Sequence, residues 1–372
     1  MATDYELVKG FLHGLKPDRI MTVSEWADSY RFLSPMASSE PGAWRTSRVP
    51  HVGEIQDKLS AHDPCQEIVF MKAAQVAGTE AGNNWIGYIM DVAPGPVMMV
   101  MPTDDTVKRN SKVRIAPMIE ATPRLRDKVA VAKSRDGDNT TYSKSFPGGV
   151  LSMTGANSAV GLRSMPVRYL FLDEIDAYPE DLDGEGSPIE LARARTRTFP
   201  KRKVLLVSTP TVDGSSAIQR EYENTDQRRR FVPCPHCGAF QTLKWEQMTW
   251  DEGDPDSARY KCEHCGDLIE ERHKPEMFAN AEWRPTRPGW KDPKRAGFHI
   301  NSLYSPLGWY SWSDAVRAFE DINGDANKAK AFVNTVLGEA YVSKGDSPPW
   351  ENLYNRRELY ATNTVDNSVA FI

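Results

Sequence analysis

The chain has 372 residues, 40% of them hydrophobic and 26% charged, which is enough to bury the core of one large domain or of two medium ones. No apolar run approaches the roughly 18 residues that a membrane span requires, and the N-terminus lacks the basic flank and apolar stretch of a secretory signal. We therefore expect a cytoplasmic protein without a membrane segment. The net charge of −5, from 46 basic and 51 acidic residues, argues against a protein that coats nucleic acid by bulk charge.

The first 227 residues divide into an arm and a core. Residues 1–50 are rich in aromatic residues and prolines without a sustained period, which indicates an N-terminal arm that packs on a core. Short apolar runs then follow at residues 67–71, 97–101, 169–172 and 204–207, separated by helical stretches. Runs without alternation are typical of parallel strands that are buried on both faces. The pattern predicts an α/β core over residues 51–227.

A loop that feeds a helix follows the first apolar run, as a phosphate-binding loop requires. The usual pattern Gly-x-x-x-x-Gly-Lys-Ser/Thr is broken, because Gly78 stands where the lysine belongs and Lys72 stands where the first glycine belongs. A lysine at the front of the loop can still fold back to the phosphates, and Thr79 then takes the hydroxyl position that holds Mg²⁺. An ordinary turn from strand to helix is the alternative.

Two further strands end in residues suited to nucleotide hydrolysis. The run at 169–172 leads directly into Asp173 and Glu174, the first acid placed for Mg²⁺ and the second for the attacking water. Acids at a strand end also serve solubility alone. The run at 204–207 leads into Ser208, Thr209 and Pro210, which suit a sensor of the γ-phosphate. The order and separation of the three features predict a RecA-like nucleotide motor that takes ATP with Mg²⁺.

Four of the five cysteines form two C-x-x-C turns, each followed by glycine. In a cytosolic protein this pattern predicts one tetrahedral zinc site, formed by Cys234, Cys237, Cys262 and Cys265. Four thiolates leave no open position, so the ion is structural. A redox dithiol or unligated cysteines are the alternatives. We place a zinc ribbon at 228–272, a helical remainder of the ATPase region at 273–345 and a linker at 346–372.

Two basic stretches could form a local DNA-binding surface, one from Arg193 to Lys203 and the other from Arg228 to Arg230. Clustered cations bind phosphates, but a solvated face with no partner has the same composition.

These features together resemble a known family, the lambda-type large terminase, which is the DNA-packaging ATPase of tailed phages. The resemblance rests on residues 40–46, the variant loop that begins at Lys72, the Leu-Asp-Glu at 172–174, the Ser-Thr-Pro at 208–210 and the Cys-Pro-His-Cys knuckle. It implies a homo-oligomeric ring in the host cytoplasm, transiently on the portal of a procapsid, that works with a small terminase subunit to drive double-stranded DNA inward.

The resemblance also implies roles for individual residues. Nucleotide and Mg²⁺ contacts fall to Lys72, Gln75, Gly78, Thr79 and Asp173, catalysis to Glu174, and coupling of hydrolysis to movement to Ser208, Thr209 and Pro210. Gln75 and Ala77 replace the arginine and glycine of related motors, so the arginine finger has to come from elsewhere. We assign it to Arg163, offered to a neighbouring subunit, with a structural arginine as the alternative. Trp44 is our candidate adenine contact, with Tyr30 and Gln56 as alternatives.

Members of the family continue into a metal-dependent nuclease domain. Because the sequence stops at residue 372, apparently as the next strand begins, we expect an ATPase portion that ends before the nuclease and does not cut DNA by itself.

Two other classes of protein share parts of the pattern. A superfamily-2 helicase or translocase has the same acidic strand, but it requires a second RecA domain with a Gly-Arg pair, and this sequence contains no such pair. A single core leaves the nucleotide site to be completed between subunits, which favours an oligomer. A non-enzymatic zinc-ribbon adaptor for nucleic acid is the other alternative, and Mg²⁺-ATP binding would exclude it.

Overall fold

The computed structural model describes residues 20–129 and 139–343. Much of the expected arm, residues 1–19, and the whole of the expected linker, 346–372, lie outside the described residues. One compact unit ends at Tyr341, and everything below concerns that unit. No helix in its described part is long and apolar enough to cross a membrane.

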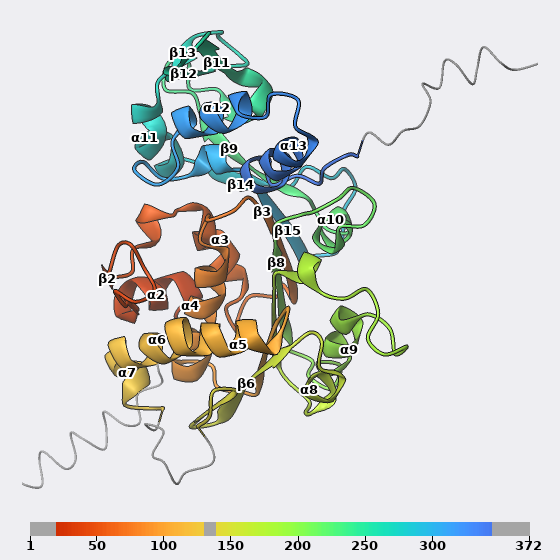
Figure 1. The fold of residues 1–372 in the computed structure, drawn as a ribbon. Helices are drawn as coiled ribbons and strands as arrows, with labels where there is room; N and C mark the ends of the chain where they lie inside the picture. The colour runs from red at the N-terminus through yellow and green to blue at the C-terminus, as the bar shows by residue number, and fades with distance from the viewer. Residues whose placement is uncertain (1–19, 130–138, 344–372) are drawn as a thin grey trace, which may run out of the picture. The chain divides into compact units, whose positions relative to one another are not determined.

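A ten-stranded, mostly parallel sheet forms the centre of the unit, as the fold prediction required (Figure 1). The strand order is β10-β9-β15-β3-β8-β7-β4-β6-β5, and β14 pairs with β9 beside this path. The parallel strands are β3 (Glu67–Lys72), β4 (Val97–Met101), β6 (Gly149–Gly155), β7 (Tyr169–Asp173), β8 (Lys203–Ser208) and β15 (Arg295–Ile300). The four apolar runs of the sequence are thus β3, β4, β7 and β8.

Antiparallel strands extend the sheet at both margins. On one side β5 (Ser143–Phe146) pairs with β6. On the other, β9 (Arg228–Pro233) runs parallel to β15 and pairs antiparallel with β10 (Phe240–Thr242) and β14 (Glu282–Arg284). The stretch expected to be a helical remainder, 273–345, therefore contributes two strands to the sheet, β14 beside β9 and β15 between β9 and β3. The domain boundaries themselves stay predictions.

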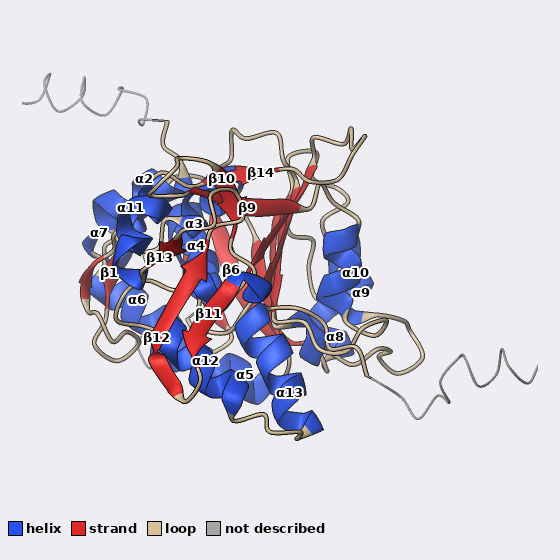
Figure 2. Ribbon diagram, turned by 90° about the horizontal axis from the view of Figure 1, so that it is seen from above, coloured by secondary structure: helices blue, strands red, loops and turns tan. Residues whose placement is uncertain are grey.

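Helices cover both faces of the sheet, which explains why its strands lack alternation (Figures 1 and 2). One face carries α2 (Val23–Tyr30), α3 (His51–Lys58), α4 (Gly78–Asp91), α5 (Asp104–Asn110), α6 (Ala116–Ala121) and α7 (Pro123–Arg126). The other carries α8 (Ala159–Arg163), α9 (Pro188–Ala194) and α10 (Ala217–Glu223). Along β3, Ile68 and Phe70 join the core on the first side, whereas Val69 and Met71 join the core on the second.

Cys234 and Cys237 lie in the turn between β9 and β10 of the large sheet, and the rest of the cysteine-rich region forms a small sheet of its own on the β9 side of the unit (Figure 1). It consists of β11 (Met248–Asp251), β12 (Asp254–Lys261) and β13 (Leu268–Ile269), with α11 (Lys274–Ala279), α12 (Trp312–Glu320) and α13 (Ala326–Phe332) nearby. Trp245 stacks with Trp250, Phe319 and Phe332 at centroid distances of 4.9 to 5.8 Å. This aromatic contact ties the ribbon to the two helices that follow β15.

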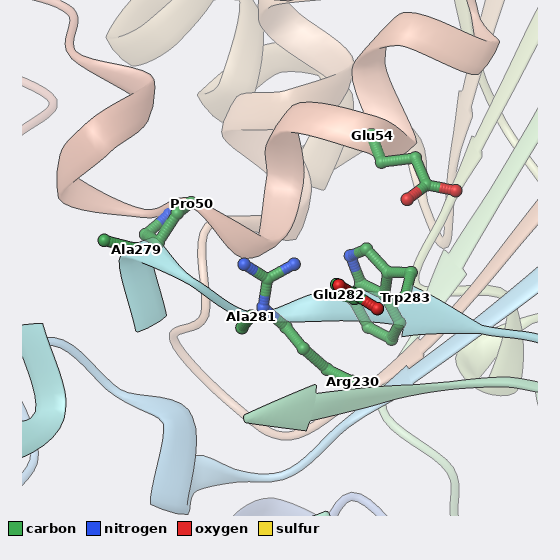
Figure 3. Close-up of a pocket in the computed structure, with 7 residues that line it drawn as sticks. All are labelled: Pro50, Glu54, Arg230, Ala279, Ala281, Glu282 and Trp283. Carbon is green, nitrogen blue, oxygen red and sulfur yellow. The ribbon is translucent and has the colours of Figure 1, made fainter. Parts of the chain in front are cut away.

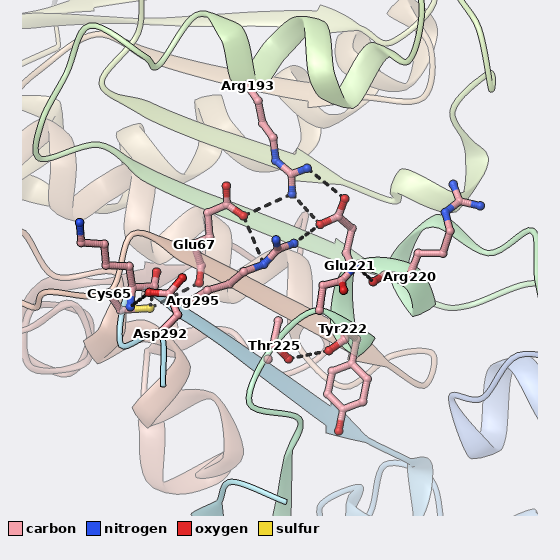
Figure 4. A network of polar contacts seen from close by, with 12 residues as sticks. Cys65, Glu67, Arg193, Arg220, Glu221, Tyr222, Thr225, Asp292 and Arg295 are labelled. Atoms are coloured by element: carbon pink, nitrogen blue, oxygen red, sulfur yellow. Dashed lines mark hydrogen bonds and ion pairs between the residues drawn. The ribbon is translucent and has the colours of Figure 1, made fainter. Parts of the chain in front are cut away.

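A network of ion pairs connects α9 and α10 to the first residues of β3 and β15, at the edge of the sheet where these strands begin (Figure 4). Arg193 of α9 binds Glu221 of α10 at 2.6 Å and Glu67, the first residue of β3, at 3.3 Å. Arg295, the first residue of β15, also pairs with Glu67 and Glu221. All four side chains are at least three-quarters enclosed, so each charge depends on its partners. Arg193, from the first basic stretch, therefore binds acids of its own chain.

We expect Arg193→Ala to lower the free energy of unfolding by about 3 kcal/mol, because the change leaves two largely buried carboxylates with Arg295 as their shared cation. Urea denaturation followed by tryptophan fluorescence measures the loss. Arg197→Ala, an exposed arginine three residues past α9, is the matched control and should change stability by less than about 0.5 kcal/mol. Equal losses in both variants would show that the network does not stabilise the fold.

Candidate nucleotide and metal sites

The sequence-predicted nucleotide residues gather at one edge of the sheet. Strands β3, β7 and β8 are adjacent and parallel, so their carboxyl ends face the same side. Lys72, Asp173 and Ser208 are the last residues of these three strands. In open α/β sheets this edge is where ligands bind.

The loop after β3 has the strained backbone of an anion-binding turn. Gln75 and Ala77 have φ angles of 55° and 61°, in the left-handed region that residues other than glycine rarely adopt. Ala73 N–H and Ala74 N–H are fixed by the carbonyls of Ile300 and Thr335, at 2.9 Å each. The chain then enters α4 at Gly78, where the first N–H groups have no acceptor within the helix. The loop therefore directs free donors and a helix N-terminus toward one place.

The Lys72 side chain lies against the start of α4. A Cβ atom added at Gly78 would lie 2.5 Å from Lys72 Cε, so the missing side chain at 78 makes room for the lysine. Lys72 Nζ donates a long bond of 3.4 Å to Ala73 O and forms no ion pair with any described residue. Burial lowers the pKa of Lys72, while the charges of Asp173 and Glu174 oppose that shift. The result is a partly buried cation beside the N-terminus of α4.

Asp173 and Thr79 form a pair that fits a divalent cation. Thr79 Oγ1 donates to Asp173 Oδ2 at 2.9 Å, and Asp173 Oδ1 is buried without a partner among the described residues. Burial raises the pKa of Asp173 to about 6, although Lys72 and the bond from Thr79 act in the opposite direction. A hydroxyl and a carboxylate with an unused oxygen are ligands that Mg²⁺ prefers, so these residues fit the ion predicted from the sequence.

Glu174 leaves the strand in a left-handed conformation, with φ of 56°, and its side chain is exposed at the same edge. Asp176, two residues on, was missed by the sequence reasoning. It accepts hydrogen bonds from Thr211 N (2.8 Å), Thr211 Oγ1 (2.9 Å) and Ile218 N (2.7 Å). The signal for it in the sequence was the third acid of Asp-Glu-Ile-Asp, which follows the adjacent pair Asp173 and Glu174.

The Ser-Thr-Pro segment, residues 208–210, is hydrogen-bonded to the acidic turn, which we define as residues 173–176. Ser208 Oγ accepts a bond from Asp176 N at 3.2 Å and donates to Thr209 O at 3.1 Å. Beyond Pro210, Thr211 O accepts a bond from Tyr341 N, and Asp213 N donates to Tyr341 O. The segment thus links the acidic turn to the last residue of the compact unit.

Three other candidates stand apart from these contacts. Arg163 ends α8 on the surface and pairs with Glu185. Trp44 is nearly enclosed, and its Nε1 donates to Thr46 Oγ1 at 3.1 Å. Gln75 is exposed on the loop. Their roles in finger, adenine and nucleotide contacts stay predictions.

The four cysteine sulfurs lie within 4.8 Å of one another. The Sγ atoms of Cys234 and Cys265 are 3.9 Å apart, and those of Cys237 and Cys262 are 4.0 Å apart. A tetrahedral zinc with bonds of about 2.3 Å requires sulfurs about 3.8 Å apart, so the cluster suggests a zinc site. The amides of His236 and His264 donate to Cys234 and Cys262 at 3.4 Å, the arrangement of a knuckle in which histidine is not a ligand.

The second basic stretch is used inside the protein. Arg228 pairs with Glu54 and Asp226, and Arg229 contacts His299. Arg230 is buried and lines a cavity of about 510 Å³ beside Pro50, Ala281 and Trp283 (Figure 3). Burial lowers the pKa of Arg230 to about 10. The side chains of Arg228 to Arg230 therefore have contacts within the protein, and their clustering can be explained without a nucleic-acid partner.

Comparison with known families gives two matches. The model described as "Phage terminase large subunit gpA, ATPase domain" matches residues 38–283, about two thirds of the chain. The model described as "Terminase large subunit gpA, endonuclease domain" matches residues 295–372. The expectation that the chain ends before any nuclease domain was therefore wrong. It rested on where the sequence stops.

Individual relatives agree with these families. The terminase large subunit of Escherichia phage lambda is 28% identical over 390 residues, covering 98% of this chain and 60% of the relative. That of Enterobacteria phage P21 is 28% identical over 365 residues, covering 90% and 55%. The chain thus spans somewhat more than half the length of these relatives. Among solved structures, the large terminase ATPase domain of Thermus phage P74-26 has 14% identity and a TM-score of 0.39, covering 75% of this chain and 90% of that one.

We expect Gly78→Ala to weaken nucleotide binding about tenfold or more, because the new methyl group would displace the Lys72 side chain. Fluorescent nucleotide titration measures the affinity. Gly53→Ala, in α3, is the matched control, since its Cβ would meet only Thr46 Cγ2 at 3.2 Å. Unchanged affinity in Gly78→Ala would mean that Lys72 does not reach the phosphates over position 78.

We expect the purified protein to hold about one zinc per chain, and Cys237→Ser to lose most of it together with several degrees of thermal stability. Elemental analysis and thermal unfolding measure the two effects. Cys65→Ser serves as control, because Cys65 is buried outside the cluster. Full zinc content in the Cys237 variant would contradict a four-cysteine site.

Proposed function

The chain belongs to the family of phage terminase large subunits of the gpA type, and from this premise we propose that it is an ATP-hydrolysing motor that drives double-stranded viral DNA into a procapsid. The observation that carries the proposal is a pair of opposite charges at one sheet edge, the partly buried Lys72 and the buried Asp173. Lys72 lies against Gly78 at the start of α4 and has no ion-pair partner among the described residues, and Asp173 Oδ1 has no hydrogen-bond partner among them. Mg²⁺-ATP supplies an anion for the first and a cation for the second.

The residues divide the chemistry among them. Lys72 and the free N–H groups at the start of α4 hold the phosphates, while Thr79 and Asp173 hold Mg²⁺. The ion, when bound, neutralises charge on the phosphate oxygens. Glu174 orients a water molecule for attack on the γ-phosphorus and accepts its proton. The bond to the β-phosphate oxygen then breaks, leaving ADP and inorganic phosphate.

The Ser-Thr-Pro segment is positioned to transmit a conformational change from the nucleotide site to residues beyond it. Ser208 contacts the acidic turn through Asp176 N, and Thr211 is held by both Asp176 and Tyr341. A shift of the turn after hydrolysis displaces residues 208–211 with it. We assign to these contacts the coupling of hydrolysis to DNA movement.

The assembly follows from the family and from the single ATPase core. We propose a homo-oligomer in the host cytoplasm that works with a small terminase subunit and docks transiently on the portal of a procapsid. Arg163 would leave Glu185 to reach the nucleotide of a neighbouring subunit. Among the described residues we find no contact that favours a superfamily-2 helicase or a zinc-ribbon adaptor over this motor.

We expect Glu174→Gln to abolish Mg²⁺-dependent ATP hydrolysis, with kcat falling at least 10³-fold, while nucleotide affinity changes less than about threefold. Phosphate release is measured across protein concentrations, with and without double-stranded DNA. Glu180→Gln, an exposed acid beyond the acidic turn, is the matched control and should keep full activity. If the unaltered chain binds no nucleotide at any concentration, the motor proposal is wrong and the adaptor takes its place.

A further inference from the structure

The phosphate loop of this chain lacks an arginine, yet the transition state of phosphoryl transfer spreads negative charge over three oxygens. Lys72 is the only cation that the loop itself supplies. A further cation beside the site would therefore stabilise this charge. Two arginines lie close by, where they pair with Glu80 in the first turn of α4.

Glu80, the residue after Thr79, binds two arginines at once. Arg31 Nη2 lies 3.1 Å from Glu80 Oε2, and Arg114 Nη1 lies 2.7 Å from Glu80 Oε1. One carboxylate between two guanidinium groups leaves the triad with a net charge of +1. This surplus charge sits one residue from the hydroxyl that contacts Asp173.

The two arginines differ in how firmly they are held. Arg31 is 2% exposed at the side chain and also bonds Asn84 Oδ1 at 3.1 Å, so it neutralises Glu80 permanently. Arg114 is 35% exposed and, among the described residues, has Glu80 as its sole ion-pair partner. If Arg114 swings away, Glu80 keeps a buried counter-ion. Arg114 is therefore the cation that can move at low cost.

The backbone also places Arg114 on the nucleotide side. It lies in a π-helical turn, Ser111–Ile115, between α5 and α6, in the segment that follows β4. Strand β4 is the sheet neighbour of β7, which carries Asp173. π-helical turns inside α-helices occur frequently at functional sites because they redirect side chains. Burial raises the pKa of Asp173, and Arg114 is among the cations close enough to oppose that shift.

We propose that Arg114 is a catalytic residue supplied by the same subunit, which exchanges Glu80 for the terminal phosphate of bound ATP and stabilises the charge that develops there. The proposal rests on the ATPase function given above. It differs from the role of Arg163, which would act on a neighbouring subunit. Glu80 then serves as the resting partner of Arg114 in the nucleotide-free state.

The test compares Arg114→Ala and Arg114→Lys with Arg109→Ala, an exposed arginine on the preceding helix. We expect Arg114→Ala to lower kcat about 10²-fold and Arg114→Lys to give an intermediate value, since lysine keeps the charge but not the fork. Arg109→Ala should match the unaltered chain. Zinc content and thermal unfolding verify that each variant is folded, and Arg114→Lys carries the test if the alanine variant is not.

Nucleotide affinities separate a catalytic role from a structural one. A side chain that contacts the terminal phosphate affects a non-hydrolysable ATP analogue and leaves ADP unaffected, so we expect about a tenfold loss for the analogue alone in Arg114→Ala. Equal losses for both nucleotides would show that Arg114 only supports the fold around Glu80. Full kcat in Arg114→Ala, beside an inactive Glu174→Gln, would overturn the proposal while leaving the ATPase intact. No hydrolysis by the unaltered chain would instead defeat the proposed function.

Mixed oligomers identify the subunit that supplies the arginine. Glu174 and an Arg114 acting within its own subunit belong to the same site, so mixing Glu174→Gln with Arg114→Ala should restore no activity. If Arg114 served the neighbouring subunit, the same mixture would contain intact sites and would recover hydrolysis. Recovery would therefore overturn the assignment to the same subunit.

Discussion

The unit is organised around two charges, the partly buried Lys72 and the buried Asp173, that lack a full set of partners among residues 20–129 and 139–343. Taking Lys72 and Asp173 out of water costs free energy, and the pKa of each is shifted toward its neutral form. The protein tolerates this because the surrounding sheet is enclosed on both faces and cannot relax toward solvent. The strained loop at Gln75 and Ala77 and the absent side chain at Gly78 follow from the same requirement, since each one lets the lysine and the backbone donors converge.

The opposite edge of the sheet balances this arrangement. There Arg193 and Arg295 share two carboxylates from β3 and α10, so every charge has a partner. The strands thus have an edge of paired ions at their beginning and, at their carboxyl ends, an edge with a strained loop and an unpartnered carboxylate oxygen. The division is typical of enzymes, where stability resides in one part of the fold and the reactive groups in another.

Much of the site was predictable because its signals are local. Lys72, Gly78 and Thr79 lie within one loop, and Asp173 follows an apolar run directly, so motif order alone placed them at one edge. The cysteine spacing predicted the cluster for the same reason. Strand β15 was not recognised, because its residues, Arg-Ala-Gly-Phe-His-Ile, include charged and small side chains. The two ring nitrogens of its buried His299 contact Arg229 and Gly338 O, which lie far from it in the sequence. Arg114 and Asp176 were missed likewise, since their partners lie 34 to 42 residues away.

The position of β15 has a consequence for how the gene can be divided. The ATPase family match ends at residue 283, yet the strand beside β3 begins at Arg295, and Thr335 O holds the N–H of Ala74 in the phosphate loop. A fragment cut at the family boundary would expose β3 as an open edge and release two loop amides. The endonuclease match begins inside the same hydrogen-bonded sheet. The two sequence modules therefore share one sheet. If recombination between phages exchanged the chain after residue 283, the incoming segment would have to supply a strand that pairs with β3 in place of β15.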